Sequence, residues 1–194
     1  MENLLLQYQR WKYIMKFIKT DFDGCYIIEL EKKIDHRGYF VRTLDKEILK
    51  NNNVNENFVQ SSISFNENKY TLRGMHYQIK PYEEEKLVMC TRGKIMDVVI
   101  DLRKDSRTFK KWISVELSQD NLCMIYIPKG MAHGFQTLEE NTEVFYQMSE
   151  YYSPEHSRGI RWNDPEFSIK WPNESPILSE KDQKYLDFKE MGEK

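Results

Sequence analysis

The stretch "KIMDVVIDL", residues 94–102, indicates most directly which kind of fold this chain adopts. Asp97 and Asp101 share one face of this segment, and apolar side chains occupy the other, at Met96, Val98, Ile100 and Leu102. Successive side chains of a β-strand point to opposite faces, so this alternation predicts a strand. "ISVEL", residues 113–117, alternates in the same way. The pattern is typical of antiparallel β-structure.

Similar segments on both sides extend the prediction to most of the chain. Turn signals recur about every ten residues, as in a sandwich or barrel. No repeat, low-complexity tract or flexible linker divides the chain, so we expect one all-β domain with short flanking helices. The expected strands are residues 25–33 and 37–45 around a turn at "IDHRG", then 58–65 and 70–78; the helices are 45–53 and 179–188, the second with Ser179 as N-cap.

Composition and charge exclude several classes of function. The chain has 194 residues, 40% of them hydrophobic, and a formal net charge of −2. This balance gives no electrostatic reason to expect nucleic acid or an anionic membrane as partner. The apolar runs are too short for a membrane span or a signal peptide. Three cysteines, at residues 25, 90 and 123, show no CxxC spacing, which favours free thiols and a cytoplasmic location.

The histidines do not form a recognisable metal motif. Metal-binding β-barrels usually carry an HxH pair followed by a Glu, whereas "GMHYQ" and "MAHGF" each hold one histidine. We therefore predict no metal. On spacing alone His76 could be an ordinary strand histidine, but Arg73, Lys86 and the "EEEK" turn, residues 83–86, bring charges of both signs near one mouth of the expected barrel, and Tyr146 is a polar aromatic in a strand-like segment. That combination favours a functional site.

Several ordered blocks of sequence resemble a known family. They are "DHRGYF", "LRGMHYQ", "EKLV", "DVVIDLRKDSRTFKKW", "IPKGMAHGFQTL", "YYSPE", "RGIRWNDPEFSIKWP" and "ILSEKD". Together they resemble the dTDP-4-dehydrorhamnose 3,5-epimerases, cofactor-independent enzymes of sugar-nucleotide metabolism. The resemblance covers roughly residues 15 to 185. It implies a cupin-type jelly-roll barrel, a homodimer that exchanges N-terminal strands, and a single domain over residues 15–194 preceded by an N-terminal extension, residues 1–14.

The resemblance also implies a reaction. A ketone at C4 of a 6-deoxy sugar acidifies the hydrogens on C3 and C5, and epimerisation needs a base on one face of the ring and an acid on the other. By resemblance His76 is the base, Asp182 orients its imidazole, and Tyr146 is the acid. No cofactor is implied. Substrate-binding positions are Arg37, Phe40, Arg42, Gln60, Ser61, Ser62, Arg73, Lys86, His133, Tyr151, Ser157 and Lys181, with Tyr151 stacking on the nucleotide base.

Three of these positions depart from the family pattern. Arg42 and Ser157 stand where glutamate is usual, and Ser62 stands where asparagine is usual. A change from Glu to Arg reverses a charge beside the nucleotide. We therefore predict that the nucleotide is not thymidine diphosphate, or that thymidine is read differently, which leaves dTDP, CDP and GDP open.

Three functions remain open from the sequence. The first is epimerisation at both C3 and C5 of a nucleoside-diphosphate 4-keto-6-deoxy sugar, as in dTDP-rhamnose biosynthesis for surface polysaccharide. The second is a single-centre epimerase, at C3 or C5 alone, acting on another nucleotide sugar. The third is a non-catalytic sugar-binding cupin, against which the intact His76, Tyr146 and Asp182 argue.

The stretch "TLRGMHYQ", residues 71–78, carries a structural prediction of its own. Arg73 and His76 would point to opposite faces of a regular strand, yet the resemblance needs both beside one substrate. Gly74 can enter backbone conformations that other residues avoid. We therefore predict a bulge or kink at Gly74 and Met75 that brings Arg73 and His76 to the same side.

Overall fold

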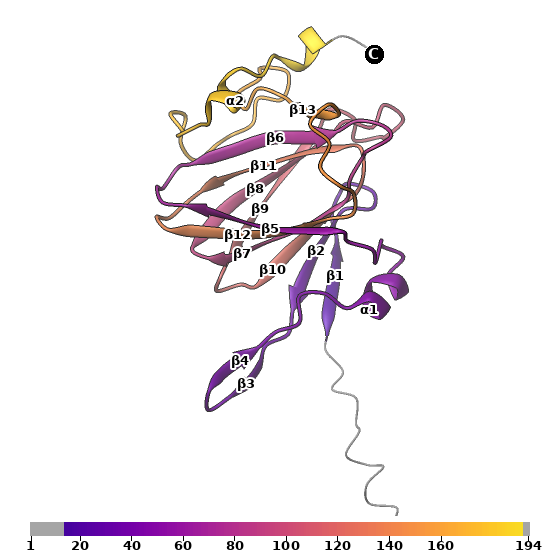
Figure 1. Cartoon of the computed structure of the whole chain (residues 1–194), viewed down its shortest axis with the longest axis vertical. Helices are drawn as coiled ribbons and strands as arrows, with labels where there is room; N and C mark the ends of the chain where they lie inside the picture. Colours follow the sequence, from indigo (N-terminus) through magenta and orange to yellow (C-terminus); the bar gives the residue numbers. More distant parts are fainter. Residues whose placement is uncertain (1–13, 192–194) are drawn as a thin grey trace, which may run out of the picture.

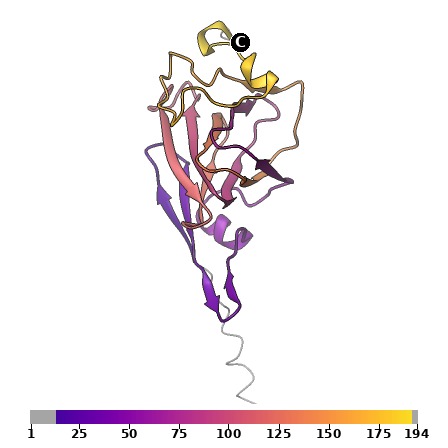
Figure 2. The same ribbon diagram turned by 90° about the vertical axis from the view of Figure 1, so that its left-hand side faces the viewer.

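A computed structural model describes residues 14–191 as a sandwich of two antiparallel sheets (Figures 1 and 2). The larger sheet has the order β1 (Met15–Lys19), β2 (Tyr26–Leu30), β10 (Cys123–Ile127), β7 (Lys86–Arg92), β12 (Thr142–Met148), β5 (Gln60–Asn66). The smaller has the order β13 (Ser157–Gly159), β6 (Leu72–Gln78), β11 (Met131–Thr137), β8 (Lys94–Asp101), β9 (Trp112–Ser118). The predicted all-β fold is confirmed.

A hairpin and a short helix between β2 and β5 lie outside these sheets. A separate hairpin, β3 (Lys33–Asp35) and β4 (Gly38–Phe40), projects from the body of the molecule (Figure 1). Helix α1 (Lys46–Asn51) begins after Asp45, whose side chain accepts hydrogen bonds from two backbone amides of the first turn. The strand predicted over residues 37–45 is therefore wrong beyond Phe40, because the chain turns there towards this cap.

The C-terminal segment covers the outer face of the smaller sheet (Figure 1). It contains α2 (Glu180–Gln183) and a 3-10 helix, η1 (Phe188–Met191), so the helix predicted over residues 179–188 is broken into shorter pieces. The prediction of Ser179 as N-cap is confirmed, since its hydroxyl accepts from the Asp182 backbone amide. This cap fixes the start of α2 and therefore the position of Asp182.

Strand β8 is buried on both faces. Val98 and Ile100 pack beneath the C-terminal segment, and Ile95 and Val99 pack between the two sheets. Asp97 and Asp101 share the face between the sheets, and neither is exposed. The alternation in "KIMDVVIDL" therefore separates two buried environments, and the carboxylates need polar partners inside the barrel.

Strand β6 contains the predicted irregularity. Opposite β11, His76 pairs with His133 and Arg73 pairs with Phe135, so three steps along β6 match two along β11. Gly74 lies in this bulge with φ +141°, and a Cβ placed there would be 2.5 Å from the Gly134 Cα. The bulge predicted at Gly74 is confirmed, and it turns Arg73 and His76 to the same side.

Two further expectations concern the N-terminal extension and membrane-spanning helices. The predicted N-terminal extension, residues 1–14, lies outside the described residues except for Ile14. Within the described range 14–191, no helix has both the length and the apolar character needed to cross a membrane.

Candidate active site

His76 lies on β6 at the open end of the space between the sheets, where it contacts Asp182 of α2. The Nε2 of His76 and the Oδ1 of Asp182 are 2.7 Å apart. The Asp182 side chain is 5% exposed and that of His76 is 39% exposed. The carboxylate is thus held by the protein while the imidazole faces an open cavity. This arrangement fixes the ring and its tautomer and leaves one edge available to a ligand.

Tyr185 packs against the other side of this pair. Its ring meets the His76 ring edge-on, with centroids 5.7 Å apart. Space for the ring exists because residue 159 is glycine: a Cβ there would lie 2.2 Å from two Tyr185 ring atoms. Gly159 pairs directly with His76 in the β13–β6 register. Burial raises the pKa of Tyr185, while Lys181 acts in the opposite direction.

Lys86 begins β7 and enters the same cavity from the opposite sheet. Its ammonium lies 2.7 Å from the Glu84 Oε1 and donates to the His76 carbonyl oxygen at 3.4 Å. The side chains of Lys86 and Glu84 are only 12% and 7% exposed. A buried ion pair of this kind places one positive charge beside the imidazole at a defined position.

A second histidine–carboxylate pair lies directly beside the first. His133 on β11 is the register partner of His76, and its Nε2 is 2.7 Å from the Asp97 Oδ2. Asp97 is fully buried, and its other carboxylate oxygen has no hydrogen-bond partner among the described residues. Burial raises the pKa of Asp97, and the charges of His133 and Lys86 act in the opposite direction.

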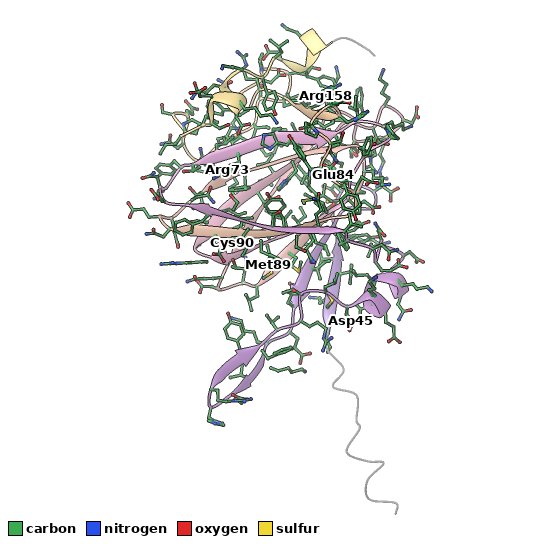
Figure 3. All side chains as sticks on the ribbon, in the orientation of Figure 1. Asp45, Arg73, Glu84, Met89, Cys90 and Arg158 are labelled. Carbon is green, nitrogen blue, oxygen red and sulfur yellow. The ribbon has the colours of Figure 1, made fainter. Side chains whose placement is uncertain are left out.

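These side chains surround two adjoining cavities of about 540 and 390 Å³. Both cavities are lined by His76, Lys86, Tyr146 and Lys181, which form their common wall. The larger also contains Arg73, His133 and Asp182, and the smaller contains Gln60, Ser62, Glu84, Tyr152 and Ser157. Figure 3 labels Arg73 and Glu84, which belong to the larger and the smaller cavity respectively.

The remaining predicted site residues lie outside both cavities. Ser61 points to the opposite side of β5 from Ser62, as strand alternation requires, and accepts a hydrogen bond from Gln147. Tyr151 and Tyr152 are similarly exposed, at 60% and 57%, and Tyr152 is the one that lines the smaller cavity. The others belong to the projecting hairpin or follow it: Arg37 pairs with Asp35, Phe40 is 55% exposed, and Arg42 lies 3.8 Å from Asp45.

The sequence did not single out Asp97, Glu84 or Tyr185. Asp97 is part of an alternating strand, and the "EEEK" turn is expected near the barrel mouth, but nothing in the sequence distinguishes Glu84 from the two glutamates beside it. One signal was available for Asp97, because an acidic residue in the middle of an apolar strand needs a partner. Within residues 14–191, no group of three or more His, Cys, Asp or Glu side chains is placed to hold a metal ion.

Fold and site together define a class. A jelly-roll sandwich whose interior carries a carboxylate-bound histidine, a tyrosine and a lysine around one cavity has the groups needed for acid–base chemistry on a small molecule. The sequence profile described as dTDP-4-dehydrorhamnose 3,5-epimerase matches residues 19–190. The chain belongs to this family of isomerases.

Individual relatives agree with this assignment. The dTDP-4-dehydrorhamnose 3,5-epimerase of Methanothermobacter thermautotrophicus is 42% identical over 178 residues, which cover 90% of this chain and 95% of the relative. The Bacillus anthracis enzyme of the same name, crystallised with TDP and PPi bound, is 44% identical with a TM-score of 0.87, covering 89% of this chain and 98% of that one.

A third relative was crystallised with a sugar nucleotide. The dTDP-6-deoxy-D-glucose-3,5-epimerase of Legionella pneumophila, in complex with dTDP-4-keto-L-rhamnose, is 35% identical with a TM-score of 0.87. It covers 92% of this chain, which covers 95% of it. The family, fold class and enzyme class predicted from the sequence are thereby confirmed.

Proposed function

We propose that this protein epimerises C3 and C5 of a dTDP-linked 4-keto-6-deoxy sugar, supplying an L-sugar precursor. The observation that carries this proposal is the His76–Asp182 pair facing Tyr146 and Lys86 across one cavity. Family membership supplies the reaction class, and the geometry supplies groups for each proton transfer. The single-centre alternative uses the same groups, so it remains an outcome of the experiment below.

His76 is the proposed base. The 4-keto group makes the hydrogens on its neighbouring carbons acidic, and a positioned imidazole can remove one of them. Asp182 holds the Nε2 side of the ring, so the Nδ1 side is the one available to the substrate. With its carboxylate 5% exposed, Asp182 stabilises the imidazolium that forms.

Tyr146 and Lys86 complete the reaction. Tyr146 lies on β12, in the sheet opposite β6, and lines both cavities, so its hydroxyl can return a proton to the ring face opposite His76. Lys86 provides a positive charge for the enolate oxygen that forms at C4. Arg73, in the larger cavity, is a further cation for the sugar or its phosphates.

The smaller cavity is the proposed nucleotide side. Gln60, Ser62 and Ser157 line it and offer hydrogen-bonding groups to a base and ribose. Tyr152 supplies an aromatic face there, the role that the resemblance gives to Tyr151. We propose thymidine in spite of the departures at Arg42, Ser62 and Ser157, because the Bacillus anthracis and Legionella pneumophila relatives hold TDP and dTDP-4-keto-L-rhamnose.

We also propose that two copies of this chain form the working enzyme in the cytoplasm. The projecting hairpin exposes apolar side chains, with Ile34 77% exposed and Phe40 55% exposed. Burial of this hairpin against a second copy would remove that apolar surface from water and bring Arg37 and Phe40 to a cavity. The buried free thiols of Cys25 and Cys90 agree with a reducing compartment.

Incubation with nucleotide 4-keto-6-deoxy sugars in D2O tests the proposal. Deuterium should enter at both C3 and C5 of the dTDP sugar. Deuterium at one carbon would favour the single-centre alternative, and deuterium at neither carbon of any sugar offered would leave a non-catalytic binder. Parallel calorimetry with free dTDP, CDP and GDP tests the nucleotide, and a preference for CDP or GDP would overturn the thymidine assignment.

A further inference from the structure

We propose that Glu84 is a positioning residue that holds the Lys86 ammonium, charged and in place, beside the reacting sugar. This inference rests on the proposed function, because it explains how one of its groups is kept ready. Glu84 belongs to "EEEK", residues 83–86, a cluster of like charges just before β7. The family assignment gives this cluster no task.

The three glutamates have different surroundings. Glu84 lines the smaller cavity and its Oε1 lies 2.7 Å from the Lys86 ammonium. Glu85 is turned away and accepts a hydrogen bond from the Asn55 side chain. Glu83 lines neither cavity. One carboxylate of three is therefore directed into the site, and the other two cannot replace it.

The Glu84–Lys86 ion pair is largely buried, so each charge is stabilised by the other and little by water. The Glu84 side chain is 7% exposed and that of Lys86 is 12% exposed. An ammonium that has lost contact with water and has no partner is costly, and it lowers that cost by releasing its proton. The Glu84 carboxylate offsets this cost at short range. Without it, the Lys86 ammonium would lose the contact that fixes its charge where an enolate forms.

Other charged groups around Lys86 do not take over this task. His76, His133, Arg73 and Lys181 line the same cavities, and each is a cation or can become one. Tyr146 lines both cavities as well, and Glu150 lines the smaller one. The buried Asp97 is close enough for Lys86 to act on its ionisation, but its hydrogen bond goes to His133. Glu84 is thus the carboxylate in direct contact with the ammonium.

The hydrogen bonds of Lys86 leave room for a substrate. The ammonium has three protons; one points to Glu84 and one to the His76 carbonyl oxygen. The third can reach a ligand oxygen. The second oxygen of Glu84 is buried without a hydrogen-bond partner among the described residues, so Lys86 is the only group that holds this carboxylate. Glu84 moves no proton in this scheme; it acts through Lys86.

A double-mutant cycle tests this dependence. Glu84→Gln should lower kcat by roughly 10- to 100-fold with little change in KM, as for other carboxylates that orient a functional group. Lys86→Met should lower kcat further. If Glu84 acts through Lys86, the double variant should be no slower than Lys86→Met alone. Glu84→Asp, which keeps the charge, should recover part of the loss.

Matched controls separate this idea from its alternatives. Glu83→Gln removes the same charge from the same turn and should leave kcat within about two-fold, as expected for a surface substitution. Additive losses in the double variant, or equal effects of Glu83→Gln and Glu84→Gln, would overturn the role of Glu84. Failure of the wild-type protein to exchange deuterium into any sugar would instead reject the proposed function. Thermal unfolding of each variant checks that the fold persists.

Discussion

The two histidine–carboxylate pairs of this protein have nearly identical contacts and different surroundings. In each, an imidazole Nε2 lies 2.7 Å from a carboxylate oxygen, and the two histidines are register partners on β6 and β11. The His76 side chain is 39% exposed and that of His133 is 11% exposed. Asp182 comes from the covering C-terminal segment, whereas Asp97 lies on β8 between the sheets.

The difference shows that contact distance alone does not identify a base. A base must reach its substrate and must stabilise a positive charge when it takes a proton. Both histidines line the larger cavity, but the His76 side chain is the more exposed, and its carboxylate comes from α2, outside the two sheets. The His133 side chain is mostly buried, and burial raises the pKa of its partner Asp97. We infer that His76 transfers protons and that His133 contacts substrate as a fixed polar group.

The largest effect should come from removing the imidazole of His76, compared with the same change at His133. His76→Asn should lower turnover by about 10²- to 10⁴-fold, the usual loss when a positioned base is removed. His133→Asn should lower it less and act mainly on KM. Steady-state kinetics and deuterium exchange at C3 and C5 measure both. Near-normal exchange in His76→Asn, or the reverse order of the two variants, would reject the assignment of the base.

The bulge that aligns the two histidines gives the next largest effect. Gly74→Val should destabilise the fold by roughly 2–6 kcal/mol, because φ there is +141° and a Cβ would lie 2.5 Å from the Gly134 Cα. Activity should fall about 10²-fold or more in the protein that still folds, since His76 loses its register with His133. Urea unfolding and kcat/KM test this. Unchanged activity at reduced stability would show that the bulge serves the fold alone.

Removing the charge of Asp182 should break one pair and leave the other intact. Asp182→Asn keeps the size of the side chain but does not stabilise an imidazolium, so we expect kcat to fall by about 10²-fold. KM should change little, because the cavity keeps its shape. The matched Asp97→Asn change should cost about ten-fold or less. Equal losses in kcat would mean that both pairs take part in proton transfer.

The sequence predicted the fold where physical patterns are local. Alternation in β8 and β9 indicates strands, and the conflict between Arg73 and His76 predicts the bulge at Gly74. It overextended the strand after Phe40, because the cap at Asp45 depends on one side chain and not on a periodic pattern. Local rules work where hydrogen bonding and side-chain period decide the backbone.

The site could be predicted only in part, for a different reason. Resemblance supplied His76, Tyr146 and Asp182, which line the cavities as a group, whereas Tyr151, Arg37, Phe40 and Arg42 lie outside both cavities in the single chain. Asp97 and Glu84 were missed because their importance depends on burial next to a partner far away in the sequence or on another strand. Burial is a property of the assembled sheets, and no spacing rule encodes it.

A smaller effect should follow from disturbing only the outer support of His76. Gly159→Ala would place a Cβ 2.2 Å from the Tyr185 ring, which must shift and carry the segment after Asp182 with it. We expect kcat to fall about ten-fold, and the His133 pair to be unaffected. Gly159→Ala combined with Tyr185→Ala removes the clash and should recover part of the activity, since the ring that supports His76 is lost as well. Failure to recover would place the damage in β13 itself.

The smallest effect concerns Asp97 and is visible in stability more than in catalysis. Burial raises its pKa above the value of about 3.9 for an unfolded Asp, with His133 and Lys86 acting in the opposite direction. A raised pKa in the folded state means that the unfolded chain releases this proton first. The free energy of unfolding should therefore fall as pH rises through the window between the two values, and level off above it.

Asp97→Asn removes this carboxyl group, so the variant should gain stability relative to wild type as pH rises from about 4. Asp101, on the same strand, has the opposite behaviour: burial acts to raise its pKa, but hydrogen bonds from Arg103, Ser106 and Thr108 bring it to about 2. Its contribution is present above about pH 4 and is lost as pH falls towards 2. The pH dependence that Asp101 causes is the same in wild type and in Asp97→Asn, so it cancels in the difference between their unfolding free energies.

Urea unfolding at several pH values between 4 and 7 measures the effect. Repeating the series with His133→Asn in both proteins removes the imidazole that faces Asp97 and isolates the carboxyl group. A difference in unfolding free energy that stays constant across this range in the proteins that keep His133 would mean that the pKa of Asp97 is not raised in the folded protein. The two pairs would then differ in access to the cavity and not in charge, and exposure alone would set His76 apart.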